Sequence, residues 1–399
     1  MVDRLAKELD TLLRTRAGAL REQEQDVFVR LARERSGSIV LFGAGGLGRK
    51  VAAGLRANGV EPAAFADNSP ERQGTEIEGV RVLSPEAAAA EFGSDSIFVV
   101  TIWGANSPHR FEQSREQLRA LGCAAMVFPP LLWAFPETLL PHYLMDLPHR
   151  VLEQKADVRR ALDLWEDEAS RAEYVSQVRF RLTADFDGLA HPVQHPQYFP
   201  DDLFAWRSDE WIVDGGAYDG DSIRMLTRLR GDRFGHVLAL EPDPGNFAKL
   251  AETVDALPTA VRAKIELRQV ALASVAGTLH LDATGTASSA TAHEAGTGTI
   301  AVPAQPLDTM VRGHSPTFIK LDIEGAEPDA LLGARETIRE AAPIVAVCVY
   351  HRQDHLWRIP LMLREWRDDF AFFLRPHNEE GWDLVCYAVP RARLERRAS

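Results

Sequence analysis

Three charged side chains in residues 320–324 have the types and spacing that proton transfer requires. Lys320, Asp322 and Glu324 alternate along the sequence, so in an extended segment all three begin on one face. Three charges at a strand end are costly unless they are paired or functional. Asp322 is the preferred candidate for substrate contact or for work as a base. For Lys320 and Glu324, a structural lysine–carboxylate pair and a direct catalytic role both stay open.

His351 follows the next apolar run, residues 344–349. An imidazole titrates near neutral pH and can accept the proton that a hydroxyl group loses when its oxygen reacts. A structural histidine is the alternative. Asp322 and His351 could also hold a divalent cation that polarises the hydroxyl, but two ligands are too few, and we predict no metal site. Glu327 is interpreted as a carboxylate at the start of a helix.

A glycine loop lies upstream, in residues 211–222. An apolar strand is followed by an acid, small residues and a glycine that opens a helix, which is the pattern of a cofactor loop. Gly216 and Gly220 keep the backbone open where a cofactor lies across it. Asp214 can face a cationic group such as an ammonium, and Tyr218 stands where a third glycine is usual. The predicted loop residues are Asp214, Gly215, Gly216, Ala217, Tyr218, Gly220 and Asp221.

Glu241 ends the next predicted strand, 27 residues after Asp214. A carboxylate there can accept hydrogen bonds from both hydroxyls of a ribose. Helix capping is the alternative, but Asp243 fits that role better because Pro244 is a good first residue of a helix. We therefore assign Glu241 to ribose. The segment 269–272, with Gln269 and Ala271, should edge the adenine, mainly through backbone groups.

A second glycine loop, residues 41–48, also follows a strand and opens a helix. Gly43, Gly45 and Gly48 satisfy G-x-G-x-x-G, with Gly46 between them, so a phosphate could reach the helix N-terminus. Asp67 lies 24 residues after Gly43, where an acid can hold ribose hydroxyls. Two interpretations stay open: a nucleotide site, or a tight strand–helix junction in a domain that binds nothing.

Together with the glycine loop and residues 238–247, three further segments resemble the FkbM-type methyltransferase family. They are Phe-Ile-Lys-Leu-Asp-Ile-Glu-Gly-Ala-Glu at 318–327, the pair Tyr350-His351, and Tyr198-Phe199-Pro200. The resemblance covers about residues 195–390. It implies S-adenosylmethionine as the cofactor and transfer of its methyl group to a hydroxyl of a sugar, polyketide or other small molecule.

The N-terminal part has a resemblance of its own, over about residues 38–130. The run 67–70 and the segment 79–85 resemble the nucleotide-sugar domains that precede sugar acyltransferases. This implies a nucleotide or nucleotide sugar as ligand. The two resemblances together imply O-methylation of a sugar or a nucleotide-linked sugar.

Two loops are expected to cover the acceptor. Tyr198 lies in a proline-rich stretch, 191–200, and Ser288 and Ser289 lie in a glycine-rich insertion, 276–303. His191 and His195, in the first of these loops, are interpreted as linker residues.

The elements that must position these residues alternate between strand and helix in two separate stretches. The first has predicted strands at 38–42, 63–66, 97–102 and 124–128. The second has seven, at 211–213, 237–240, 265–270, 318–321, 344–349, 371–374 and 384–389, of which the last two should be antiparallel. Such alternation predicts parallel sheets covered by helices. The fold class is therefore α/β, with two Rossmann-like doubly wound domains, the second having a seven-stranded class I methyltransferase sheet.

The predicted domain order follows from these elements. It is an N-terminal helix (1–35), a Rossmann-like nucleotide-binding domain (36–130), a helical bridge and loop (131–204), the methyltransferase domain (205–390) and a solvated basic tail (391–399).

Composition limits the partners. The chain of 399 residues has 45 lysines and arginines against 58 aspartates and glutamates, a formal net charge of −13. A negative surface disfavours nucleic acid, no apolar run is long enough for a membrane span, and three cysteines without zinc spacing fit a cytoplasmic protein. The expected partner is a small-molecule hydroxyl acceptor, and a homo-oligomer formed through the N-terminal helix is possible.

Two rival functions stay open. One is a nucleotide-sensing or scaffold protein without catalysis. The other is an NAD-dependent oxidoreductase that uses the loop at 41–48, although no residues for hydride transfer can be identified. The identity of the acceptor, the position methylated, the need for a metal and the oligomeric state do not follow from the sequence.

Overall fold

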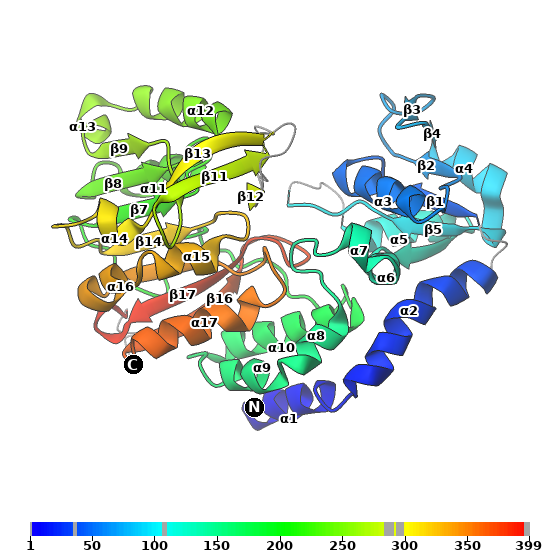
Figure 1. Cartoon of the computed structure of the whole chain (residues 1–399), viewed down its shortest axis with the longest axis horizontal. Coiled ribbons are helices and arrows are strands. Elements are labelled where there is room, and N and C mark those ends of the chain that lie inside the picture. Colours follow the sequence, from blue (N-terminus) through cyan, green and yellow to red (C-terminus); the bar gives the residue numbers. More distant parts are fainter. Residues whose placement is uncertain (1, 35–37, 106–109, 283–290, 293–298, 395–399) are drawn as a thin grey trace.

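The computed structural model describes residues 2–34, 38–105, 110–282, 291–292 and 299–394. Figure 1 shows two sheet-containing domains at opposite ends of the molecule and a group of helices that runs beneath both. Ser288 and Ser289 lie outside the described residues. Among the described residues, no helix combines the length and the apolar character needed to cross a membrane.

The N-terminal domain is built on a six-stranded sheet in the order β3-β4-β2-β1-β5-β6. The strands are β1 (Ile39–Phe42), β2 (Ala64–Ala66), β3 (Glu76–Ile77), β4 (Val80–Leu83), β5 (Ile97–Val100) and β6 (Ala124–Val127). All pairs are parallel except β3 with β4. Every residue of β1 and β5 is buried, as expected for strands covered on both faces. Helices α3 (Gly46–Ala57), α4 (Pro85–Phe92) and α5 (Phe111–Ala120), with the 3₁₀ turn η1 (Gly93–Asp95), complete the domain.

The predicted single N-terminal helix is two helices, α1 (Val2–Leu12) and α2 (Ala17–Glu34). The chain turns between them, and the Arg14 amide donates to the carbonyl of Thr11, three residues back. The turn lets α1 pack on α9 and α10 while α2 packs on α6 and α8. A straight helix could not bury Leu9 and Leu20 against both surfaces, which is why the prediction of one helix was wrong.

A helical bridge joins the two domains. It consists of α6 (Pro129–Ala134), α7 (Pro136–Leu139), α8 (Pro148–Glu153), α9 (Lys155–Leu162) and α10 (Glu168–Thr183). Asp167 caps α10 by accepting from the amide of Ser170, and Ala184 ends it in the left-handed conformation. Helix α10 packs against strand β16 of the larger sheet, so the bridge is part of the C-terminal core.

The C-terminal domain has a seven-stranded sheet in the order β16-β17-β15-β14-β7-β8-β9. The strands are β7 (Trp211–Gly215), β8 (His236–Leu240), β9 (Ile265–Arg268), β14 (Phe318–Leu321), β15 (Ile344–Cys348), β16 (Phe370–Pro376) and β17 (Leu384–Pro390). Only β17 is antiparallel to its neighbours. The predicted fold class and the count of seven strands are confirmed.

The register of the strands brings the predicted site residues to one edge of this sheet. Lys320 lies opposite Asp214, and Leu321 lies opposite Gly215. Because β7, β8 and β14 are parallel, the segments that follow them meet at their carboxyl ends, where open α/β sheets hold ligands.

A small second sheet stands beside this edge. It contains β10 (Ala271–Leu272), β11 (Gly277–Asp282), β12 (Thr291–Ala292) and β13 (Thr299–Gln305), and includes the predicted hairpin. Figure 1 shows β11 and β13 on the side of the larger domain that faces the N-terminal domain. The remaining helices are α11 (Asp221–Arg230), α12 (Pro244–Asp255), α13 (Thr259–Arg262), α14 (Leu307–Met310), α15 (Glu327–Leu332), α16 (Arg335–Ala341), α17 (His355–Trp366) and the 3₁₀ turn η2 (Arg391–Arg393).

The C-terminal segment is less free than a solvated tail would be. Arg391 pairs with Glu166 at 2.7 Å, and Arg393 pairs with the buried carboxylate of Glu210. These ion pairs attach η2 to the bridge and to the start of β7. The prediction of a solvated tail is therefore wrong for residues 391–393, and residues 395–399 lie outside the described part.

The two domains touch through the loop between β16 and β17. The rings of Trp103 and Trp382 lie 4.5 Å apart, and Asn378 donates from Nδ2 to the carbonyl of Ala105 at 2.7 Å. Arg110 forms an ion pair with Glu379. Trp103 and Ala105 follow β5, so the carboxyl edge of the smaller sheet contacts the larger domain.

Candidate active site

A cavity of about 270 Å³ opens at the carboxyl edge of the larger sheet. Its wall includes five predicted cofactor residues, which are Gly216, Tyr218, Asp221, Glu241 and Ala271. It also includes three predicted catalytic residues and one predicted acceptor residue, which are Lys320, Asp322, Glu324 and Tyr198. Tertiary folding therefore brings together segments from β7, β8, β10, β14 and the proline-rich loop.

The glycine loop after β7 is tightly packed against the segment after β14. Gly216 has φ +76°, and a Cβ there would lie 1.9 Å from the carbonyl oxygen of Asp322. Gly220 has φ +86° and precedes α11, where a Cβ would lie 2.8 Å from Thr253 Cγ2. Tyr218 also has a positive φ, of 47°. That conformation explains why glycine is usual at this position.

Asp214 does not line the cavity. Its Oδ1 lies 3.0 Å from Lys320 Nζ, and its Oδ2 accepts from Ser222 Oγ. Because this carboxylate is already paired, the geometry does not favour a direct contact between Asp214 and a cofactor ammonium. Its place is to hold Lys320, which donates to the carbonyl of Gly216 at 2.5 Å.

Four other predicted cofactor residues also lie off the wall, and they are Gly215, Ala217, Gly220 and Gln269. Gly215 and Ala217 are buried, and a Cβ at Gly215 would lie 2.7 Å from Leu272 Cδ1. Gln269 is exposed, with its Nε2 3.4 Å from the carbonyl of Pro242. Val270, Ala271 and Leu272 line the cavity, so three of the four residues in the segment predicted to contact the adenine lie on its wall.

Glu241 is buried on the cavity wall and is held by two backbone amides. Its Oε2 accepts from Tyr218 N and its Oε1 from Asp243 N, both at 2.9 Å. Burial raises the pKa of Glu241 to about 7, against the effect of these two amides. Asp243 caps α12 by accepting from Asn246 N at 2.9 Å, which confirms the assignment of the capping role to Asp243.

Lys320 is a buried cation surrounded by carboxylates. Burial alone would lower the pKa of the ammonium, but the charges of Asp214, Asp322 and Asp221 raise it above its ordinary value. Its Nζ also lies 5.2 Å from the centre of the Tyr198 ring. Lys320 therefore stays charged and cannot serve as a base.

Asp322 and Tyr198 form a direct pair on the cavity wall. The Tyr198 hydroxyl donates to Asp322 Oδ2 at 2.7 Å and lies 3.4 Å from Cys348 Sγ. Burial, and then the charge of Asp322, raise the pKa of Tyr198 well above its ordinary value. Tyr198 thus remains a hydrogen-bond donor and fixes the orientation of the Asp322 carboxylate.

His351 lies behind the wall and does not line the cavity. Its Nδ1 is 2.7 Å from Glu327 Oε1, and its Nε2 is 3.3 Å from Asp322 Oδ1. Burial would lower the pKa of the ring, but Glu327, Glu324 and Asp322 raise it to about 10. The raised pKa and the place behind the wall favour a positioning role for His351 over a role as the direct base.

Glu327 is the residue that positions His351, and the sequence assigned it only a helix-start role. It is completely buried at the start of α15 and accepts from the amide of Ile323 at 2.9 Å. Burial would raise the pKa of this carboxyl, but His351 and His355 hold it well below its ordinary value. His355 Nδ1 lies 3.3 Å from its Oε2.

Glu324 lines the cavity next to Asp322. Its backbone has φ +58°, and its Oε2 lies 3.9 Å from His351 Nε2. Burial raises the pKa of Glu324 to about 7, with a smaller opposite effect from His351. No lysine pairs with Glu324 among the described residues, so the structural lysine–carboxylate interpretation applies to Lys320 and Asp214 instead.

Sequence reasoning missed several wall residues. Tyr350 lines the cavity from the segment after β15 and Asp383 from the loop before β17, and Leu279 and Leu281 line it from the hairpin. Burial and the charge of Asp322 raise the pKa of Asp383 to about 6. Tyr350 could have been found, because it belongs to the Tyr350-His351 pair. Nothing local distinguishes Asp383, nor Ala105, which reaches the wall from the other domain.

In the N-terminal glycine loop, Gly43 and Gly48 allow close packing within the loop itself. A Cβ at Gly48 would lie 1.9 Å from the carbonyl oxygen of Gly43, and Gly43 itself has φ +118°. Asp67 accepts from Ala44 N at 2.7 Å and pairs with Arg72 at 3.1 Å. Because this carboxylate already holds the loop, its predicted ribose contact is not supported. Gly45 and Gly46 do have open space where a Cβ would stand.

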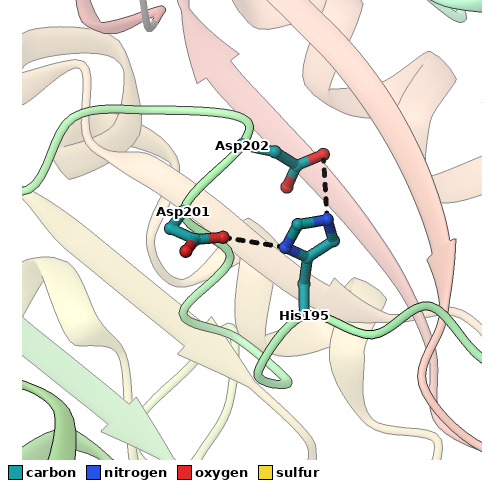
Figure 2. A group of neighbouring side chains, drawn as sticks. All are labelled: His195, Asp201 and Asp202. Carbon is teal, nitrogen blue, oxygen red and sulfur yellow. Dashed lines mark hydrogen bonds and ion pairs between the residues drawn. The ribbon is translucent and has the colours of Figure 1, made fainter.

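A second cluster of ligand-type side chains lies on the surface. Figure 2 shows His195 between Asp201 and Asp202, with Nδ1 2.8 Å from Asp201 Oδ1 and Nε2 3.8 Å from Asp202 Oδ2. The two ring nitrogens face different carboxylates, and the Asp201 side chain is 72% exposed. Arg375 also lies 3.7 Å from Asp202. This is the geometry of surface ion pairs, and His195 stays a linker residue.

Comparisons with known proteins identify a methyltransferase domain in this part of the chain. Residues 214–375 match the model of the methyltransferase FkbM domain family. The crystal structure of methyltransferase FkbM from Methylobacillus flagellatus KT superposes with a TM-score of 0.75 at 21% identity, over 97% of this chain and 100% of that chain. At that identity the likeness shows a shared fold, which includes the N-terminal domain.

A putative rRNA-methylase from Clostridium thermocellum matches with a TM-score of only 0.27 and 12% identity, over 47% of this chain and 89% of that one, and carries no argument. No curated protein matches the sequence.

Proposed function

Residues 214–375 match the FkbM methyltransferase domain, and from that premise we propose that this chain methylates a hydroxyl group of a small molecule. S-adenosylmethionine is the methyl donor that such a domain implies. The proposed acceptor is a sugar or a nucleotide-linked sugar.

The charges on the cavity wall suit a cationic cofactor. Five carboxylates line the wall, from Asp221, Glu241, Asp322, Glu324 and Asp383. The one lysine on the wall, Lys320, is paired with Asp214. S-adenosylmethionine carries a sulfonium and an ammonium, and opposite charges in a buried site stabilise such a ligand. In this proposal Glu241 holds the ribose and the loop 214–221 supports the methionine part.

The main support for methyl transfer to an oxygen atom is the hydrogen bond between Tyr198 and Asp322. Tyr198 donates to Asp322 Oδ2 at 2.7 Å, which presents the carboxylate to the cavity in one orientation. Asp322 then takes the proton of the acceptor hydroxyl while the oxygen attacks. The cofactor supplies an electrophilic methyl group, whose bonding electron pair stays with sulfur when the new C–O bond forms. Alignment of the reacting atoms provides most of the rate.

One residue of the cavity wall, Ala105, supports the proposal that the acceptor contacts both domains. Ala105 follows β5 of the N-terminal sheet, yet it lines the cavity. The open space at Gly45 and Gly46 lies at the start of α3, where backbone amides favour phosphate. Both features favour a phosphorylated or nucleotide-linked sugar over a small free alcohol.

Calorimetry with S-adenosylmethionine and S-adenosylhomocysteine is the first test. We expect binding in the micromolar range by the full chain, and binding at least about tenfold weaker in Glu241→Ala. A panel of sugars, sugar phosphates and nucleotide sugars is then screened for release of S-adenosylhomocysteine. Absence of cofactor binding would overturn the proposal, and binding without turnover on any acceptor would favour a sensing or scaffold protein.

A further inference from the structure

His351 and Asp322 approach each other without forming a hydrogen bond. Nε2 of His351 lies 3.3 Å from Oδ1 of Asp322, and within the described residues neither atom has a hydrogen-bond partner. The His351 side chain is only 1% exposed. A buried ring nitrogen and a buried carboxylate oxygen that face each other in this way leave their bonding capacity unused.

Other ligand-type atoms converge on the same point. Glu324 Oε2 lies 3.9 Å from His351 Nε2. Asp322 Oδ1 and Glu324 Oε2 therefore both lie within 4 Å of this nitrogen. Metal–ligand bonds of about 2.0–2.2 Å place neighbouring ligand atoms about 3–4 Å apart, so the distances from Nε2 to each of these two oxygens suit ligands of one ion.

The histidine is held as metal-binding histidines usually are. Its other ring nitrogen, Nδ1, lies 2.7 Å from Glu327 Oε1. Glu327 is in turn fixed by the amide of Ile323 and by His355. A buried carboxylate behind the ring fixes its orientation and directs the far nitrogen at the ion. The surface cluster in Figure 2 lacks this support, because both ring nitrogens of His195 face carboxylates at the surface.

The local charge also favours a cation. The carboxylates of Asp322, Glu324 and Glu327 lie within 4 Å of the ring nitrogens of His351. Lys320 pairs with Asp214. A cation bound to Nε2 replaces the ring proton there, and these negative charges stabilise it.

We propose that His351 Nε2, Asp322 Oδ1 and Glu324 Oε2 bind a divalent cation of the Mg²⁺ or Mn²⁺ class at the acceptor side of the cavity. The oxygen-rich set with one imidazole suits these ions. The inference rests on the proposed function, because the cation would lower the pKa of the acceptor hydroxyl next to it. The hydroxyl proton still passes to Asp322, through the Oδ2 atom that faces Tyr198.

The test is Mn²⁺ binding by the full chain without cofactor, measured by electron paramagnetic resonance and calorimetry. We expect one equivalent of Mn²⁺ to bind, with affinity reduced at least about tenfold in His351→Gln and Asp322→Asn. Glu327→Gln acts through His351 and should weaken binding about 10–100-fold without removing the site. His195→Gln is the matched control and should bind Mn²⁺ as the parent chain does.

A second readout does not depend on variants that fold poorly. In protein with ¹⁵N-labelled histidine, Mn²⁺ should broaden the signals of His351 and His355 first and leave that of His195 sharp. Broadening of His195 alone, no binding of Mn²⁺, or unchanged affinity in His351→Gln and Asp322→Asn would overturn the proposal. Cofactor binding is measured on the same samples after chelator treatment. A chain that binds S-adenosylmethionine but no Mn²⁺ refutes the metal site and leaves the proposed function standing, whereas failure to bind the cofactor refutes the proposed function.

Discussion

Lys320 and Asp214 lie opposite each other on the paired strands β14 and β7, with Nζ 3.0 Å from Oδ1, and both are buried. Removal of one partner leaves the other charge buried and unpaired, which costs about 3–5 kcal/mol. We therefore expect Lys320→Met to lose about that much free energy of unfolding in urea. It should also weaken binding of S-adenosylmethionine, because Lys320 holds the carbonyl of Gly216.

The double variant Lys320→Met/Asp214→Asn supplies the control for this pair. Its loss of stability should be smaller than the sum of the two single losses, because no buried charge is left unpaired. Strict additivity would show that the two charges act independently.

Cofactor affinity should rise with pH around neutrality because of Glu241. Burial raises the pKa of its carboxyl to about 7, so the group is mostly protonated at pH 6 and mostly ionised at pH 8. The ionised form accepts hydrogen bonds from the ribose hydroxyls. We expect Kd for S-adenosylmethionine to fall by up to about tenfold from pH 6 to pH 8 in calorimetry. Glu241→Gln should bind weakly at both values, and an equal pH slope in that variant would exclude Glu241 as the source.

The close approach of the two loops makes Gly216 intolerant of a side chain. Gly216→Ala places a Cβ 1.9 Å from the carbonyl oxygen of Asp322 at φ +76°. We expect a loss of about 2–4 kcal/mol in the free energy of unfolding, together with loss of cofactor binding. Gly46→Ala is the matched control, since a Cβ there meets nothing within 4 Å. It should change stability by no more than about 1 kcal/mol. Similar losses in both variants would contradict the loop packing described above.

Substitution of Asp322 should slow turnover without weakening cofactor binding. Asp322→Asn keeps the shape of the side chain but cannot take the hydroxyl proton, so kcat should fall about 10²–10⁴-fold. Kd for S-adenosylmethionine should change by no more than about threefold. Tyr198→Phe removes the donor that orients Asp322 and should slow turnover less. Release of S-adenosylhomocysteine measures kcat, and an active Asp322→Asn enzyme would require another base.

The N-terminal domain should affect the acceptor and not the cofactor. Ala105 lines the cavity from the segment after β5, so Ala105→Leu should raise KM for the acceptor about fivefold or more by narrowing the wall. Ala57→Leu, at an exposed position on α3, is the control. A higher Kd for S-adenosylmethionine in Ala105→Leu, with KM for the acceptor unchanged, would place the residue on the cofactor side.

Local patterns in the sequence determined the elements and their order. Alternating apolar runs predicted seven strands of the larger sheet, and the structure has strands at all seven positions. The charged run 320–324 and the glycine loop predicted residues of the cavity wall, because parallel strands bring their carboxyl ends to one edge. These features depend on neighbours within a few residues, which a sequence displays directly.

Only the tertiary structure decided which of these side chains face the cavity and what charge they carry. Asp214 and His351 looked like site residues, but Lys320 pairs with the first and Glu327 holds the second behind the wall. Tyr198 meets Asp322 across 124 residues of sequence, and Ala105 reaches the wall from another domain. Burial and partners from distant segments set pKa values and orientation. No local pattern contains them, because they arise only when the separate segments pack together.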